Sequence, residues 1–286
     1  MRRYELELSP GGRKVRLDGK TVRPLAKYFG AFNVVVFTPE DLSLPRGAPG
    51  DRRRFLDRSC FNLEPSYLVT ASDYDKVVRT RNSVLRQAGE GRIAMRQVDE
   101  LLAVYDVQLA QLAVAMIAAR VKLLEILGPE LASAFAAITR TGLQATVRYV
   151  SKLVGASAEA IEAQLREGRA RDLASQATQL GPHRDDLLFE LSEREAGSFA
   201  SQGQLRAIML AWKTAELAVL ARMHGDLPIL LLDDVSSELD PSRNEYLFEH
   251  LAQLAGQCFI TTTDAAHVRI KQDRADYRLE AGRILV

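Results

Sequence analysis

The feature that most limits the fold is PILLLDDVSSELD, residues 228–240, where a run of aliphatic residues ends in two aspartates. A short continuous aliphatic run bounded by turn residues predicts a strand buried on both faces, as in a parallel sheet. Predicted helices and strands alternate on both sides of this run. We predict helices at 201–223 and 241–255 and strands at 186–191 and 258–261. Strands alternating with helices predict an α/β fold with a parallel sheet.

The start of the chain is also rich in predicted strands. Alternating residues on both sides of Asp18–Gly19 predict a hairpin, and FNVVVF, residues 32–37, predicts a buried strand. Thr38 followed by Pro39 then predicts the start of a helix.

From there to about residue 177 the pattern is helical. Apolar residues from Val98 to Ile126 follow a heptad spacing, which predicts one long helix that ends at Gly128–Pro129. This helix either packs in a bundle or extends as a coiled-coil arm. A strand at 146–150 and a helix at 158–176 are expected after it.

Composition excludes several classes of protein. With 47% hydrophobic and 26% charged residues, the 286-residue chain is typical of globular proteins. A net charge of +1 gives no overall field toward nucleic acid, so any DNA binding needs a local patch. The longest apolar run, residues 112–119, is too short to cross a membrane. Two cysteines far apart in the sequence favour a reducing cytoplasm.

The two aspartates predict chemistry at the end of the buried strand. Asp233 is placed to hold Mg²⁺ through water, and Asp234 to face an attacking water. A polar turn with capping acids is the structural alternative. A metal-dependent nuclease that uses Asp233, Asp234 and Glu238 is another interpretation, although such sites usually recruit further dispersed acids or histidines.

The segment FASQGQLR, residues 199–206, predicts a helix start that can bind an anion. Ser201 is a candidate N-cap, and Gly203 lets another molecule approach the backbone. An ordinary capped helix is the alternative. In FITTTD, residues 259–264, the hydroxyls of Thr262 and Thr263 are weak candidates for sensing a phosphate.

A phosphate loop is missing from the 286 residues. The sequence DGKT at 18–21 ends like one, but Lys14 stands where the first loop glycine belongs, and the segment joins two strands. No other Gly-Lys is followed by Ser or Thr.

Six motifs together resemble the RecF family of bacterial recombination mediators, in the same order and over nearly all of the chain. They are VVVFTPEDLSLPRGAPGDRRRFLD, YDKVVRTRNSVLRQ, GPHRDD, ASQGQLR, PILLLDDVSSELD and FITTTD. The resemblance implies an ABC/SMC-type ATPase head of the P-loop NTPase class with an inserted, mostly helical lobe. It also implies a cytoplasmic, ATP-dependent homodimer that uses ATP and Mg²⁺, binds single- and double-stranded DNA, and works with RecO and RecR to load RecA at gaps.

The resemblance further suggests roles for particular residues and a division of the chain. Asp233 and Asp234 are the expected catalytic acids, with Asp233 near the metal. The expected nucleotide contacts are Ser201, Gln202, Gly203, Gln204, Asp240 and Thr263. A β-rich part of the ATPase lobe is expected at 1–38, a helical lobe at 39–177 and the remaining ATPase lobe at 178–286.

The chain departs from the family pattern at its start, which corresponds to a point roughly 80 residues into that pattern. Without the phosphate loop we expect no ATP hydrolysis by these 286 residues. Two hypotheses follow: an ATPase whose N-terminal part is lost, or a non-enzymatic descendant that binds DNA or a partner. The first predicts that the strand at 258–261 pairs with 229–232 on one side, while its other edge leaves Phe259 or Ile260 exposed or covered by a rearranged neighbour.

Arginines in two predicted helices are candidates for DNA binding. They are Arg52, Arg53, Arg54, Arg79 and Arg81. Acids lie among them, so a solvated, ion-paired surface is the alternative. Contacts of this kind would involve the phosphate backbone without reading sequence. In GPHRDD, His183 is expected to be structural and not catalytic.

Overall fold

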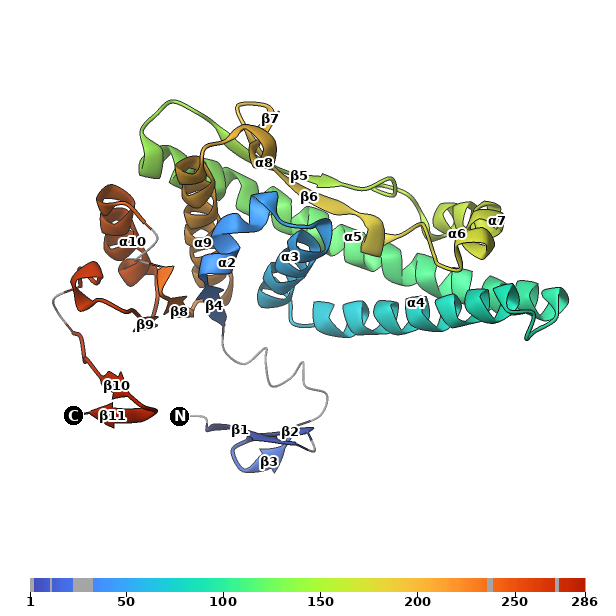
Figure 1. Ribbon diagram of the computed structural model, residues 1–286, viewed down its shortest axis with the longest axis horizontal. Coiled ribbons are helices and arrows are strands. Elements are labelled where there is room, and N and C mark those ends of the chain that lie inside the picture. Colours follow the sequence, from blue (N-terminus) through green and yellow to red (C-terminus); the bar gives the residue numbers. More distant parts are fainter. Residues whose placement is uncertain (1–2, 11, 23–32, 236–238, 271–272, 286) are drawn as a thin grey trace.

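The computed structural model describes residues 3–10, 12–22, 33–235, 239–270 and 273–285. Figure 1 shows an elongated molecule with a small parallel sheet at one end and two short helices, α6 and α7, at the other. A single long helix, α5, runs between these ends.

The predicted parallel sheet is present. Its strand order is β4 (Val34–Phe37), β8 (Ile229–Asp233) and β9 (Gln257–Thr261), and all pairs are parallel. The two crossover helices are α9 (Gln202–His224) and α10 (Pro241–Leu254). β8 is the central strand, and its aliphatic run is typical of a parallel strand that is covered on its faces: Leu230 and Leu232 are buried, and Ile229 and Leu231 are half-buried.

Strand β9 lies at an edge of this sheet. Among the described residues it pairs only with β8, with Phe259 opposite Leu231. The Phe259 side chain is 53% exposed, and Ile260 is half-buried. The expectation of an open edge with an exposed aromatic residue is therefore confirmed.

The strand predicted from DLLFEL belongs to a different sheet. β6 (Asp186–Leu191) pairs antiparallel with β5 (Ala145–Val150) and with β7 (Arg194–Glu195). Placing it in the parallel sheet was wrong, because its inward residues Leu187 and Phe189 pack on helices of the core and not beside β8. In this sheet β5 comes from the segment expected to form the helical lobe, up to residue 177, and β6 comes from the segment expected to form the ATPase lobe, from residue 178.

The long helix α5 (Met95–Thr139) does not end at Gly128–Pro129. Leu127, Leu131 and Phe135 are completely buried, while Pro129 faces solvent. Burial of the apolar residues on both sides outweighs the one backbone hydrogen bond that proline removes, and the exposed carbonyl can be hydrated. The prediction of the helix was correct and that of its end was wrong.

Helix α5 packs within the molecule along its whole length. Its neighbours are α3 (Pro49–Leu63), α4 (Tyr67–Gly89), α9 and the helix α6 described next. In the heptad row, Val98, Leu102 and Leu109 are buried, which matches a bundle and not a free coiled-coil arm. By length and hydropathy α5 alone, among the described helices, could cross a membrane, but it is a core helix here.

One predicted helix is divided in two. α6 (Ala158–Glu167) and α7 (Arg169–Ser175) meet at Gly168. The turn lets Asp172 reach Arg81 of α4 at 2.6 Å. The buried Arg81–Asp172 ion pair therefore holds α7 in this direction, and the local sequence does not predict this pair.

The remaining elements are short. Asp18 and Gly19 both have positive φ angles in the first hairpin, as a tight two-residue turn requires, so this hairpin is confirmed. The bounds are β1 (Tyr4–Ser9), β2 (Gly12–Leu17), β3 (Lys20–Thr21), α2 (Pro39–Ser43), η1 (Leu44–Arg46), η2 (Pro182–Arg184), α8 (Ala196–Phe199), η4 (Ala265–His267), β10 (Arg278–Glu280) and β11 (Arg283–Leu285).

The turn GPHRDD between α7 and β6 is fixed by His183. Its Nδ1 lies 2.7 Å from the Tyr74 hydroxyl and its Nε2 lies 3.0 Å from the Thr178 carbonyl oxygen. Gly181 has a φ of +132°, and a Cβ there would lie 2.2 Å from the Tyr74 hydroxyl. His183 is thus enclosed as a structural residue.

Protonation of His183 should weaken the fold. Burial, with help from the nearby Arg184 and Arg53, lowers the pKa of His183 below its usual 6.5, so the folded protein resists a proton that the unfolded chain accepts. The contribution is complete above pH 6.5 and is lost as pH falls through the lowered pKa, by up to about 1.4 kcal/mol per pH unit. Urea unfolding at pH 7.5 and 5.5 checks this. His183→Gln, which does not titrate, should show a smaller loss, and an equal loss would contradict the assignment.

Candidate nucleotide site

The start of α9 has the predicted cap. The Ser201 hydroxyl accepts a hydrogen bond from the Gln204 backbone N–H at 3.2 Å, and the Gln204 side chain accepts one from the Ser201 N–H at 2.8 Å. Ser201 and Gln202 are exposed, so this end of the helix is open to a ligand. Free backbone N–H groups and the helix dipole favour an anion there.

Arg243 of α10 connects this helix start to the acidic turn after β8. A Cβ on Gly203 would lie 3.2 Å from Arg243 Nη1, so the guanidinium lies close to this glycine and would have to shift slightly to admit a larger residue. The same Nη1 donates to Asp240, and the Arg243 N–H donates to Asp240 Oδ1 at 3.1 Å. Although burial opposes it, hydrogen bonds from Ser242 and Arg243 lower the pKa of Asp240. Gly203 and Asp240 are therefore brought together, through a residue that sequence reasoning missed.

The acids at the end of β8 are held by β9. Thr261 Oγ1 donates to Asp233 Oδ1 at 2.5 Å, and the Asp234 N–H donates to the Thr261 carbonyl oxygen at 3.0 Å. Asp234 has a φ of +50°, an uncommon conformation for a residue other than glycine. Strained backbone of this kind often occurs at functional sites.

The residues at the end of β8 fit the expected Mg²⁺ only in part. Asp233 is exposed at the carboxyl end of its strand, and a carboxylate is a suitable ligand for Mg²⁺. In the described ranges no three His, Cys, Asp or Glu side chains converge into a metal cluster. Asp233 can thus supply one ligand, with phosphate and water oxygens as the others. Glu238 lies outside the described residues.

The threonine hydroxyl that reaches the acidic turn is not one of the two that were predicted. Thr261, which was not predicted, reaches Asp233. Thr262 instead donates to the Asp264 carbonyl oxygen at 2.9 Å, and Thr263 is exposed. The strand register explains the difference, since it places Thr261 opposite Asp233, whereas Thr262 and Thr263 follow the end of β9.

A buried lysine fixes α9 against the parallel sheet. Lys213 Nζ donates to the Val36 carbonyl oxygen at 2.7 Å and lies 3.1 Å from Asp41 Oδ2. Burial lowers the pKa of Lys213, while Glu216 and Asp41 oppose that shift. The contact sets the position of the helix that begins at Ser201.

Two of the five arginines proposed for DNA are unavailable. Arg81 is completely buried, and Arg52 is buried and makes two hydrogen bonds to Asp186, at 2.9 and 2.6 Å. Both are structural ion pairs, so their assignment to DNA is corrected. Arg53 is half-buried, and Arg54 and Arg79 are exposed.

Comparison with known proteins identifies the family. DNA replication and repair protein RecF of Myxococcus xanthus (strain DK1622) is 40% identical over 278 residues, covering 94% of this chain and 71% of that protein. The chain belongs to the RecF family. RecF of Anaeromyxobacter sp. (strain Fw109-5) is 38% identical over 293 residues, covering 99% of this chain and 77% of the relative. A scan against protein-family models finds no match.

A solved structure supports the same family at the level of fold. The recombination mediator RecF, in a structure described as RecF-ATPrS in the RecFOR pathway, aligns with 99% of this chain and 76% of its own. The TM-score is 0.84 at 28% identity. The predicted fold class, an ABC/SMC-type head with a mostly helical lobe, is confirmed. As a RecF-family member, the chain is a DNA replication and repair protein.

Proposed function

We propose that this RecF-family chain supplies the signature side of an ATP-dependent dimer. Ser201, Gly203 and Gln204 close on the γ-phosphate of a nucleotide held by the opposite subunit, and Asp240 lies beside them. When a phosphate loop completes the site, Asp234 would orient the attacking water and Asp233 would hold Mg²⁺. The observation that carries the proposal is the position of Arg243, which is hydrogen-bonded to Asp240 and lies next to Gly203.

Family membership supports a proposed cellular role. The dimer binds DNA by its phosphate backbone and acts in the cytoplasm with RecO and RecR to load RecA. Free thiols at Cys60 and Cys258 support a reducing compartment. Because the one Gly-Lys-Thr sequence among the 286 residues, at 19–21, belongs to the β2–β3 hairpin and not to a phosphate loop, we propose that they do not hydrolyse ATP by themselves. The alternative is a DNA- or partner-binding protein without catalysis.

Substituting Ser201 tests the trans contact. We expect the chain, mixed with Myxococcus xanthus RecF, to form an ATP-dependent heterodimer in sedimentation experiments. Ser201→Arg should reduce its formation at least 10-fold, because a bulky cation would replace the cap at the phosphate position. The chain alone should show no ATP turnover.

Ser157→Arg is a matched control. Ser157 caps α6 in the same way, accepting a hydrogen bond from the Ala160 N–H at 3.2 Å, but lies in the other lobe. It should keep the heterodimer. Assembly that ignores ATP, or that survives Ser201→Arg, would favour the non-catalytic alternative.

A further inference from the structure

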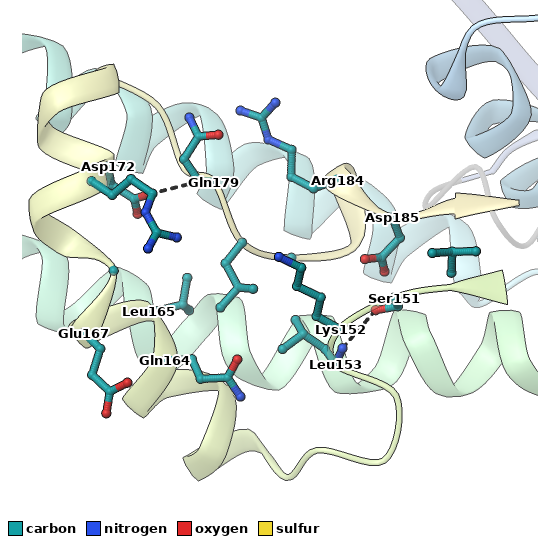
Figure 2. Close-up of a pocket in the computed structure, with 15 residues that line it drawn as sticks. Ser151, Lys152, Leu153, Gln164, Leu165, Glu167, Asp172, Gln179, Arg184 and Asp185 are labelled. Carbon is teal, nitrogen blue, oxygen red and sulfur yellow. Dashed lines mark hydrogen bonds between the residues drawn. The ribbon is translucent and has the colours of Figure 1, made fainter.

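A cavity with polar and charged side chains among its lining residues lies at the end of the molecule remote from the parallel sheet. It has a volume of about 580 Å³ and opens between the segment after β5, the helices α6 and α7, and the turn at η2 (Figure 2). The polar residues that line it include Ser151, Lys152, Gln164, Arg171, Gln179 and Arg184. It shares no residue with the candidate nucleotide site.

The acids in the wall of this cavity already have partners. Asp172 is paired with Arg81 at 2.6 Å and accepts the Gln179 N–H at 2.9 Å. Asp185 accepts the Tyr149 hydroxyl and lies 4.0 Å from Arg120. Both aspartates are buried, and Arg81 and Arg120 offset their negative charge.

The cations of the cavity are not neutralised in this way. Lys152, Arg171 and Arg184 are exposed, and within the described ranges no carboxylate lies within 4.0 Å of their side-chain nitrogens. Arg184 donates to the Thr178 carbonyl oxygen through Nε and Nη2, both at 3.2 Å, which fixes its guanidinium in place. Of the three lining acids, only Glu167 has no such partner in the described part of the chain, since Arg81 and Arg120 behind the wall offset the other two, so the unpaired charges of the lining are three cations and one acid.

Three exposed cations around one cavity create a local positive potential, which attracts an anion. They come from three separate elements, so the fold itself brings them together. Guanidinium groups and an ammonium group are the usual donors to phosphate, and guanidinium geometry matches two phosphate oxygens.

We propose that this cavity binds a phosphate group. The phosphate is either a phosphodiester of a DNA strand or the monoester of a free nucleotide, both of which present the same oxygens to Lys152, Arg171 and Arg184. The DNA source rests on the proposed function, whereas phosphate binding itself does not depend on it. The site is separate from the nucleotide site at Ser201.

The test compares a charge reversal in the cavity with one outside it. Fluorescence anisotropy measures the binding of a labelled oligothymidylate without a terminal phosphate and of a fluorescent AMP analogue, with no ATP present. The double variant Lys152→Glu/Arg171→Glu removes two cations of the lining. Arg166→Glu is the control, because Arg166 is exposed on α6 but does not line the cavity.

Two results would support the proposal and identify the source. Loss of oligothymidylate affinity by 10-fold or more, with a salt slope lower by about 1.4, indicates a DNA strand. An equal loss for the AMP analogue alone indicates a free nucleotide. Lys152→Gln/Arg171→Gln should give a smaller loss in the same direction, with circular dichroism confirming that each variant is folded.

Three results would overturn it. They are a change below twofold for both probes, an equal effect of Arg166→Glu, or tighter binding of a polyglutamate peptide than of either phosphate probe by the parent protein. Because this assay contains no ATP and leaves Ser201 intact, its failure would not affect the proposed dimer. Failure of the Ser201 test would likewise leave phosphate binding open to measurement.

Discussion

Arg81→Ala is expected to destabilise the protein by about 3–5 kcal/mol, because it leaves a buried carboxylate without its cation. Arg81 lies 2.9 Å from Asp106 and 2.6 Å from Asp172, and all three residues are buried. Asp106 keeps a second partner, Arg169 at 2.8 Å, whereas Asp172 loses its only ion pair among the described residues. Urea unfolding followed by circular dichroism gives the free energy of unfolding.

Arg79→Ala is the matched control for this prediction. Arg79 lies two residues earlier on the same helix and is exposed, so we expect a change within about 0.5 kcal/mol. If the two variants differ by less than 1 kcal/mol, on the order of one hydrogen bond, the buried network does not stabilise the helical lobe as the structure implies.

Trp212→Ala is expected to cost about 3–5 kcal/mol through loss of buried surface and the cavity that remains. Trp212 of α9 is completely buried. Its ring lies 5.0 Å from that of Phe55 in α3 and 5.8 Å from that of Phe189 in β6, measured between centroids. One side chain therefore joins three elements from distant parts of the sequence.

Trp212→Phe separates size from aromatic contact. A phenyl ring keeps part of the packing against Phe55 and Phe189, so we expect a smaller loss, about 1–2 kcal/mol. Urea unfolding of both variants measures the difference. A loss below 1 kcal/mol for Trp212→Ala, well under the usual range for such a change, would mean that this core readjusts around the missing ring.

Local sequence was sufficient where a signal and its structure lie close together. The Asp18–Gly19 turn, the Ser201 cap and the aliphatic run of β8 each need only a few neighbouring residues. The motif order was also enough to indicate the family. For these elements, propensity, capping and burial all favour the same structure.

Long-range contacts determined what sequence did not predict. Helix α5 continues through Pro129 because Leu131 and Phe135 are buried in the core. The DLLFEL strand pairs with β5, about forty residues earlier, through a register that no local pattern specifies. Arg81 looks the same in sequence as the exposed Arg79, and only its partners on α5 and α7 distinguish them.

The candidate site shows the same division. Ser201 and Gly203 were found because capping and glycine have local signatures. Arg243 and Thr261 were missed, since an arginine at a helix start or a threonine at a strand end is common. Their importance depends on what the fold places opposite them, namely Gly203 and Asp233.

Helix α5 sets the distance between the two ends of the molecule. Its 45 residues span about 68 Å at 1.5 Å per residue. Near one end Glu130 pairs with Arg222 of α9, and toward the other Asp106 pairs with Arg169 of α7, each at 2.8 Å. The two ion pairs are separated by about 36 Å along the helix axis. Because α5 also packs against α3, α4 and β5 between these points, it works as a strut that keeps α7 at a set distance from α9.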